Sequence, residues 1–369
     1  MRGKLQRTWK IMDWPGLFLA AALIAFGVVI VKAATAGTRM AALGERQLFY
    51  GVSALSLLLL VLFISYEVWI EYSAIFYGIC VLLLIIMPVV GHSVAGSKSW
   101  LSLGGYSLQP SEVAKVLAAL ACAGYIKDLE NRTMEKRDFA ILFGIIGLPM
   151  ILTALQPDFG TATTFLPMFA AVFFVSGLEL SKLAKWAALG LASVAILFAI
   201  GWFTFFRPYQ KERVLTFLDP SLDPKGAGYQ VMQAKIAVGS GQFTGKGLYS
   251  GTQNRLNFLP APYTDFVFGV VCEETGFIGA GLLLALYMAL LLRVVSAQEL
   301  AKDPEGRFLA ASAFFMLLYH ILINTGMVVG LLPTTGIPLP FLSYGGSALF
   351  SMTMMVALAL NVRMRRYSV

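Results

Sequence analysis

Ten apolar runs recur along the sequence, and their length constrains the fold more than any other feature. A transmembrane helix needs about 17–25 predominantly apolar residues. The ten runs approach or exceed that length and lie at residues 15–34, 46–65, 70–90, 111–126, 139–155, 160–178, 184–206, 266–292, 307–331 and 341–362. Hydrophobic residues make up 58% of the chain and charged residues only 13%, so a soluble fold could not bury this much apolar surface. We therefore predict an all-α polytopic membrane protein of ten transmembrane helices, with residues 1–369 forming a single transmembrane domain.

Lysine and arginine are distributed unevenly between the two sides that ten spans would define. The side that holds both termini receives 16 of them, and the opposite side receives 12. Seven of those 12 lie between residues 207 and 265, and long loops weigh little in the positive-inside rule. The remaining segments give 16 against 5. This bias predicts that both termini are cytoplasmic and that residues 207–265 form a large extracytoplasmic loop between helices 7 and 8.

The predicted loop 207–265 is rich in glycine and proline. This composition favours turns and short re-entrant or interfacial helices over an independent globular domain. The stretch "GYQVMQAKIAVGS", residues 228–240, is a candidate for one amphipathic helix of this kind.

Several function classes find no support in the sequence. The net charge of +8 would suggest nucleic acid in a soluble protein, but in a membrane protein basic residues orient the helices. The three cysteines are scattered through apolar runs, and His92 and His320 lie far apart, which argues against a disulfide framework and a histidine metal site. The sequence contains no nucleotide-binding glycine fingerprint.

Charged residues near the predicted fourth and sixth spans are candidates for chemistry. Glu112 and Lys115 follow a predicted helix start at Pro110 and Ser111, with Ser111 as the N-cap. Their spacing of three places them on one helix face, where they form either a local ion pair or a charged group at a polar cavity. Asp158, in "LQPDFGT", is either a helix cap or an acidic group that holds a substrate or a cation.

Three carboxylates accompany the predicted eighth span, in "LPAPYTDFVFGVVCEETGF". Asp265 stands at its start, where an N-cap or first-turn acid is the simplest interpretation. Glu273 and Glu274 lie roughly 12–14 Å further along an uninterrupted helix. We expect that depth to be inside the hydrocarbon, where the carboxylates must face other helices, pair, take protons or line water. Helical geometry separates the three, so they cannot all serve one site.

The segment 324–350 interrupts a membrane-spanning pattern with Pro333, Pro338 and Pro340. We predict a kinked, re-entrant hairpin here, which membrane proteins tolerate only where protein or water buries the backbone.

This segment also carries a family signature. Asparagine is followed at fixed spacings by Gly–Leu–x–Pro, a glycine and Ser–Tyr–Gly–Gly–Ser, here residues 324–347. Further blocks are "QPSEVAK", "QPDFGT", "DPKGAGYQ", "GTQNRLNFLP" and "TDFVFGVVCEETGFIG". With these motifs the chain resembles the shape, elongation, division and sporulation (SEDS) family of RodA, FtsW and SpoVE over nearly its whole length. The "DPKGAGYQ" and "GTQNRLNFLP" blocks favour the RodA branch.

The resemblance implies a peptidoglycan glycosyltransferase of the bacterial cytoplasmic (inner) membrane. Such proteins polymerise lipid II, a disaccharide-pentapeptide on undecaprenyl pyrophosphate, into β-1,4 glycan strands during cell elongation and shape maintenance. They work with a class B penicillin-binding protein, a transpeptidase that crosslinks the strands. The partners implied are thus lipid II, the transpeptidase and membrane lipid, with no nucleic acid.

The resemblance also implies site residues. The essential aspartate of the family's "TDF" block corresponds to Asp265, which we expect to act as the base. Glycosyl transfer needs a base for the acceptor hydroxyl and positive charge for the departing pyrophosphate. The expected substrate-binding residues are Lys115, Glu112, Asp158, Arg213, Lys246 and Ser343. No metal site or cofactor is required by the sequence, although Mg²⁺ or Mn²⁺ could bridge carboxylate and pyrophosphate.

Two alternatives are open at this point. Intramembrane glutamates and broken helices also suit a lipid II flippase or another transporter. A scaffold that recruits a wall synthase is the second alternative. Polymer formation from lipid II by the purified protein distinguishes the three hypotheses.

Overall fold

The computed structural model describes most of the chain, and it is mostly helical. The described residues are 11–94, 97–104, 106–130, 132–177, 211, 215–217, 219, 222–223, 226–256, 258–259 and 261–367. The predicted seventh span, residues 184–206, lies outside them. The helices are α2 Trp14–Thr35, α3 Ala41–Phe63, α4 Tyr66–Glu71, α5 Ser73–Val90, α6 Pro110–Lys127, α7 Lys136–Leu155, α8 Phe159–Thr163, α9 Leu166–Val175, α12 Ala227–Ser240, α13 Thr252–Arg255, α14 Val267–Glu299, α15 Pro304–Val328 and α16 Gly346–Met364, followed by the 3-10 turn η2 Arg365–Tyr367.

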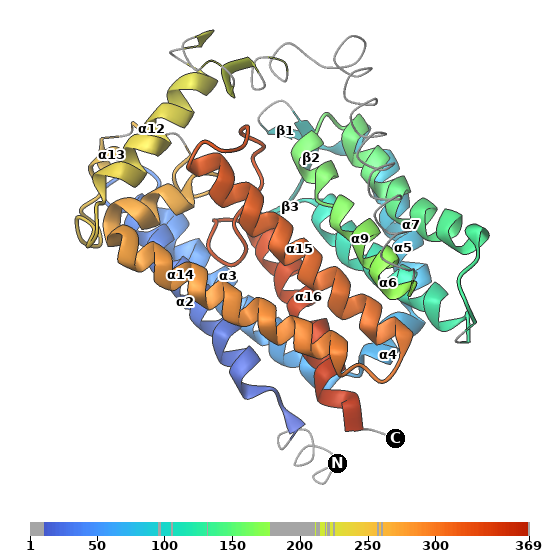
Figure 1. Ribbon diagram of the computed structural model, residues 1–369. Coiled ribbons are helices and arrows are strands. Elements are labelled where there is room, and N and C mark those ends of the chain that lie inside the picture. Colours follow the sequence, from blue (N-terminus) through green and yellow to red (C-terminus); the bar gives the residue numbers. More distant parts are fainter. Residues whose placement is uncertain are drawn as a thin grey trace.

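Seven described helices are long and apolar enough to cross a membrane, namely α2, α3, α5, α7, α14, α15 and α16. They form a bundle in which α16 is the most buried of the seven and packs against α3, α15, α14 and α6 (Figure 1). Small residues and the absence of charge before Arg363 let α16 occupy this central position. The chain is therefore a multi-pass membrane protein, as the apolar runs predict.

Helix boundaries follow local chemistry. Glu135 and Asp138 form a reciprocal capping box at the start of α7. Asp303 caps α15 by accepting a hydrogen bond of 2.7 Å from the Gly306 amide. The predicted N-cap at Ser111 is wrong, because α6 begins at Pro110 and Gln109 is the flanking residue.

A small antiparallel sheet corrects the prediction of an all-α chain. Its strands are β1 His92–Val94, β2 Ser97–Leu103 and β3 Tyr106–Leu108, in the order β1-β2-β3. Leu103 pairs with Tyr106, and Gly104 between them has a φ of +57°. A glycine-containing two-residue connection between alternating residues is a hairpin signal. The sequence analysis considered only apolar runs of helix length, and it therefore did not predict this hairpin.

Helix α14 consists of two helical pieces. Gly276 has φ 68° and ψ −167° inside it, a conformation open essentially only to glycine. The backbone of residues 241–247 fills the break: the amides of Phe277 and Ile278 donate to the carbonyls of Gln242 and Phe243. A Cβ atom at Gly276 would lie 2.3 Å from the Gly245 nitrogen, so no side chain fits there.

The break changes the predicted position of the two glutamates. Residues 277–299 alone form a helix roughly 34 Å long, enough for the hydrocarbon core. Glu273 and Glu274 therefore precede a complete span instead of lying deep inside one. Both bind the predicted extracytoplasmic segment, because Glu273 accepts from Lys246 at 2.6 Å and Glu274 accepts from the Tyr249 amide at 3.2 Å.

The predicted helix at residues 228–240 is confirmed as α12, Ala227–Ser240. It packs against α14 and α15, with α13 beside it (Figure 1). Its contacts therefore place the segment before Asp265 against two membrane helices.

Candidate functional site

A non-helical segment at the centre of the bundle organises the candidate site. This central loop, residues 329–345, joins α15 to α16, as the three prolines predict. It is held by the transmembrane helices, because His320 Nδ1 lies 3.0 Å from the Pro338 carbonyl and the Tyr287 hydroxyl donates to the Pro340 carbonyl. Side chains of the loop such as Phe341 are buried. Burial by protein is what makes irregular backbone tolerable at such a place.

The backbone of the central loop is unusually constrained at Phe341. This residue has a φ of +67°, which is costly for a side chain larger than glycine and is found where surrounding structure enforces it. A Cβ atom at Gly27 of α2 would lie 2.2 Å from the Phe341 carbonyl oxygen. The loop is thus pressed directly onto a transmembrane helix.

Asp265 lies next to this loop. It stands one residue before the N-cap, Phe266, so the prediction of an N-cap or first-turn position is wrong by one to two residues. A Cβ atom at Gly336 would lie 3.6 Å from Asp265 Oδ2, which places the carboxylate beside Gly336. Asn324 Nδ2 donates to the Asp265 carbonyl at 3.0 Å and to the Ile337 carbonyl at 2.8 Å. Asn324 therefore fixes Asp265 and the loop relative to each other.

Ser343 performs a similar connecting role. Its hydroxyl donates to the Thr264 carbonyl at 2.6 Å and accepts from the Leu339 amide at 2.8 Å. The Tyr344 amide donates to the Tyr263 carbonyl at 2.7 Å. Ser343 is buried, so in this conformation its hydroxyl holds the Asp265 segment against the central loop.

Helix α8, which Asp158 caps, contacts the same loop. Asp158 caps this helix by accepting from the Thr161 amide at 3.2 Å, and it also accepts from Gln109 Nε2 at 2.8 Å. A Cβ atom at Gly160 would lie 2.3 Å from the Thr335 carbonyl oxygen. Helix α8, which Asp158 caps, and Asp265 therefore lie against adjacent residues of one loop, Thr335 and Gly336, although they are far apart in sequence.

Glu112 and Lys115 form the predicted ion pair, with 2.9 Å between Lys115 Nζ and Glu112 Oε1. Ser351 of α16 donates to the other carboxylate oxygen at 2.6 Å. The side chain of Lys115 is 0% exposed, so its ammonium serves the interior of the bundle in this conformation. The local-pair interpretation describes the geometry, and a direct contact with substrate would require Lys115 to be uncovered.

The two remaining predicted residues lie in the segment before Asp265. Lys246 Nζ contacts Glu273 at 2.6 Å and the Thr252 hydroxyl at 2.7 Å, so its ammonium has protein partners. Arg213 lies outside the described residues.

Three further residues contribute to this geometry. Asn324 and Gln109 stand in motifs of the sequence but had no role assigned to them, and Lys235 was only one of several basic residues of the predicted loop. Asn324 is a buried amide in an apolar helix, a signal of a structural or functional demand. Gln109 supports Asp158, as described above. Lys235 of α12 is exposed and its stem lies over the central loop, because a Cβ atom at Gly330 would meet Lys235 Cε at 1.9 Å.

The arrangement combines the half-buried carboxylate of Asp265 at Gly336, the helix-capping carboxylate of Asp158 in the neighbouring α8, and the exposed ammonium of Lys235 over Gly330. Because the backbone of Asp265 is fixed by Asn324, its carboxylate is positioned to accept a proton from a hydroxyl that binds beside it. An exposed ammonium at the same loop can stabilise a developing phosphate charge. Within the described residues, no cluster of three or more His, Cys, Asp or Glu side chains could hold a metal ion.

Known proteins resemble this chain along its length. Escherichia coli (strain K12) peptidoglycan glycosyltransferase MrdB is 36% identical over 363 residues, covering 96% of this chain and 94% of that protein. Stage V sporulation protein E of Bacillus subtilis (strain 168) is 36% identical over 327 residues, covering 88% and 87%.

Solved structures agree with the fold. The rod shape determining protein RodA of Thermus thermophilus matches with a TM-score of 0.71 at 30% identity, covering 97% of this chain and 98% of that one. A chain from a peptidoglycan synthase complex, studied for the structural coordination of polymerization and crosslinking, matches with a TM-score of 0.80 at 32% identity, covering 97% and 99%. The model of the cell cycle protein family FtsW/RodA/SpoVE matches residues 15–368. The chain therefore belongs to the FtsW/RodA/SpoVE family, the SEDS proteins.

Proposed function

We propose that this peptidoglycan glycosyltransferase polymerises lipid II into β-1,4 glycan strands during cell elongation, with release of undecaprenyl pyrophosphate. The reaction class follows from the family and from relatives such as MrdB. The observation that supports the site is the placement of Asp265 beside Gly336, with its backbone fixed by Asn324 and Ser343 through Thr264.

Asp265 acts as the general base. The acceptor hydroxyl oxygen attacks the anomeric carbon of the donor, its proton passes to the Asp265 carboxylate, and the bond to pyrophosphate breaks with inversion. The donor already carries a good leaving group, so one base suffices and a second catalytic carboxylate is unnecessary. Asp158, held by Gln109 and its own helix, positions the sugar from α8, which contacts the loop at Thr335.

Positive charge near the loop stabilises the departing pyrophosphate. Lys235 is the cation we favour for direct contact, because it is exposed and lies over Gly330. Lys246 and Lys115 are paired with Glu273 and Glu112, which favours structural support of the site for both. Arg213 remains a proposed pyrophosphate ligand.

The reaction as proposed needs no cofactor. A Mg²⁺ or Mn²⁺ ion that bridged Asp265 and pyrophosphate would draw most of its ligands from pyrophosphate and water, since the described residues supply no preformed cluster. Treatment with a chelator distinguishes the two forms of the reaction. Full activity after the treatment would support the metal-independent form, and loss of activity would support the metal-bridged form.

The proposed topology has ten spans with both termini cytoplasmic. To the seven apolar helices it adds α6, the pair α8 and α9, and residues 184–206, which lie outside the described residues. Met12, before α2, and Met364, at the end of α16, line one pocket. These two parts of the chain therefore lie at the same end of the bundle, which supports an even number of membrane crossings between them. The site then faces the extracytoplasmic side, where lipid II presents its sugar. A class B penicillin-binding protein is the proposed partner, supported by the match to a chain of a peptidoglycan synthase complex.

The purified protein, reconstituted with lipid II, provides the test. We expect glycan polymer on a gel from the wild-type protein and a loss of about 10²- to 10⁴-fold in Asp265→Asn, the range for removal of a general base. Glu299→Gln removes one exposed carboxylate at the other end of α14 and should leave the activity unchanged. If folded Asp265→Asn made as much polymer as the wild-type protein, the assignment of Asp265 as the base would be wrong. Transbilayer movement of labelled lipid II without polymer would support the transporter instead.

The two lysines give a second test of the site. Lys235→Gln should raise the KM for lipid II about tenfold without changing thermal stability, because it removes an exposed phosphate contact. Lys246→Gln should lower stability more than it changes KM, because this lysine is tied to Glu273. The reverse pattern would return the pyrophosphate role to Lys246.

A further inference from the structure

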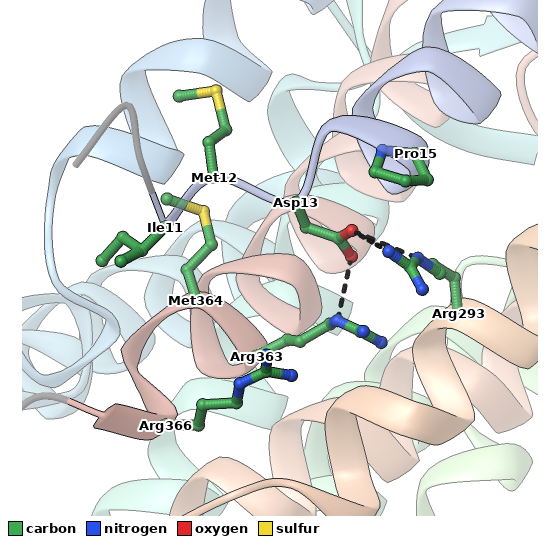
Figure 2. A pocket seen from close by; sticks show the side chains of 8 residues that line it. All are labelled: Ile11, Met12, Asp13, Pro15, Arg293, Arg363, Met364 and Arg366. Atoms are coloured by element: carbon green, nitrogen blue, oxygen red, sulfur yellow. Dashed lines mark hydrogen bonds and ion pairs between the residues drawn. The ribbon is translucent and has the colours of Figure 1, made fainter. Parts of the chain in front are cut away.

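A basic pocket lies at the end of the bundle opposite the candidate site. It has a volume of about 240 Å³, and it is lined by Ile11, Met12, Asp13, Pro15, Arg293, Arg363, Met364 and Arg366 (Figure 2). The residues come from the segment before α2 and its first turn, from α14, and from the end of α16 and the turn η2. None of them belongs to the site proposed for glycosyl transfer.

The pocket gathers more positive than negative charge. Arg293 donates to Asp13 Oδ1 through Nε at 3.1 Å and Nη2 at 2.6 Å, and Arg363 Nε lies 3.3 Å from Asp13 Oδ2 (Figure 2). Arg363 also donates to the Ser296 hydroxyl. Arg366 is the third arginine of the lining. Among the described residues, Arg293 and Arg363 share the single carboxylate of Asp13, so this group of three carries a formal charge of +1.

Orientation of the helices alone does not explain this arrangement. Arginines that only satisfy the positive-inside rule, or the dipole at the end of α16, can remain fully solvated. Here the side chains of Arg293 and Arg363 are only 29% and 14% exposed and converge from separate helices. Withdrawing cations from water around one carboxylate is costly unless a further anion joins them.

The residues around the pocket are typical of the headgroup region of a membrane. Trp14 begins α2 directly after Asp13 and is exposed beside Phe18, with 6.0 Å between ring centroids. Exposed tryptophan at a helix end is typical of the membrane–water interface. Leu292, next to Arg293, is also exposed. An acyl chain could therefore run along α14 while a headgroup occupies the pocket.

We propose that this pocket binds the headgroup phosphate of an anionic phospholipid. Guanidinium groups suit phosphate because their planar donors match its oxygens. Basic pockets between transmembrane helices bind anionic headgroups in this way. The volume is below the roughly 300–1,000 Å³ of sites for drug-sized ligands, which favours a headgroup over a nucleotide. The inference depends on the chain crossing a membrane and not on the proposed glycosyl transfer.

Thermal unfolding of the purified full-length protein tests the proposal. Short-chain phosphatidylglycerol, short-chain phosphatidylcholine and inorganic phosphate are added separately at equal concentrations. Phosphatidylglycerol should raise the Tm of the wild-type protein in a saturable manner, and the other two should give little or no shift. Arg363→Gln/Arg366→Gln should weaken the apparent affinity for phosphatidylglycerol at least about tenfold, since each lost contact is charge-assisted.

A double substitution of exposed arginines elsewhere, Arg137→Gln/Arg307→Gln, removes the same charge and should keep the wild-type affinity. Should Arg363→Gln/Arg366→Gln not fold, Arg366→Gln alone should weaken binding about threefold, and Arg366→Lys should restore part of it. Equal affinity in the wild-type protein and these variants would overturn the proposal. A shift with inorganic phosphate as large as that with phosphatidylglycerol would overturn the lipid as the source of the phosphate.

Discussion

Two lysine–glutamate pairs in this protein have the same chemistry but different architecture. Glu112 and Lys115 lie three residues apart in α6, with exposed side-chain fractions of 2% and 0%. Glu273 and Lys246 lie 27 residues apart and join the break in α14 to the preceding segment, with Lys246 still 26% exposed. The first pair is closed by helix geometry alone. The second pair exists only after the long-range fold has formed.

The partners of the two carboxylates sharpen this difference. Among the described residues, Glu112 accepts one hydrogen bond apart from that of its lysine, from Ser351. Glu273 Oε1 also accepts from the amides of Thr252 and Gln253, at 2.8 and 3.0 Å. Removing the lysine therefore leaves Glu112 almost without compensation, whereas Glu273 keeps several donors.

The largest expected effect comes from Lys115→Met. It leaves the Glu112 carboxylate buried and unpaired, so the free energy of unfolding should fall by about 3–5 kcal/mol. Denaturant or detergent unfolding of the purified protein measures this change. The double variant Glu112→Gln/Lys115→Met should recover most of the loss, because no buried charge remains. A double variant as unstable as the single one would show that the pair does more than neutralise itself.

Gly276→Ala tests the break that the second pair secures. Its φ of 68° and the approach of Gly245 should make the substitution cost about 2–3 kcal/mol. Gly281 is the matched control, since it lies in the same helix with open space around it. Gly281→Ala should be neutral or stabilising by up to about 1 kcal/mol. Equal thermal stability of the two variants would mean that the break is not required.

Lys246→Met should cost less than Lys115→Met, about 1–2 kcal/mol, because the amide donors still hold Glu273. The combination of Lys246→Met with Glu273→Gln should not restore stability, since those amides then lose a charged acceptor. A double-mutant cycle on each pair gives the comparison directly. A larger coupling energy for Glu273 and Lys246 than for Glu112 and Lys115 would reverse the distinction.

Lys302 and Glu67 supply the exposed reference pair. Their ion pair measures 2.8 Å, with exposed fractions of 32% and 43%. Lys302→Gln should change the free energy of unfolding by less than about 1 kcal/mol. An effect as large as that of Lys246→Met would show that burial is not what separates these pairs.

The same distinction explains how much the sequence alone could predict. Local patterns were sufficient for seven of the ten apolar spans, the pair in α6, the cap at Asp158 and the helix at residues 228–240. Each of these depends on residues within one or two helical turns. The family signature added the importance of Asp265 and the central loop.

Long-range contacts were not accessible in this way. Nothing in the local pattern of α14 shows that residues 241–247 enter it at Gly276, so Glu273 and Glu274 were predicted to lie too deep. The positions of Lys235 over Gly330 and of Gly160 against Thr335 likewise depend on which helices become neighbours. The hairpin at residues 97–108 was a local feature, but the helical expectation for a membrane protein concealed it.

The filled break in α14 also has a consequence for amide hydrogen exchange. The amides of Phe277 and Ile278 donate to the carbonyls of Gln242 and Phe243 in the preceding segment. Their protection factors therefore measure how often residues 241–247 detach, separately from fraying of the helix. Two adjacent positions thus form a built-in probe of that contact, which needs neither a label nor a substitution.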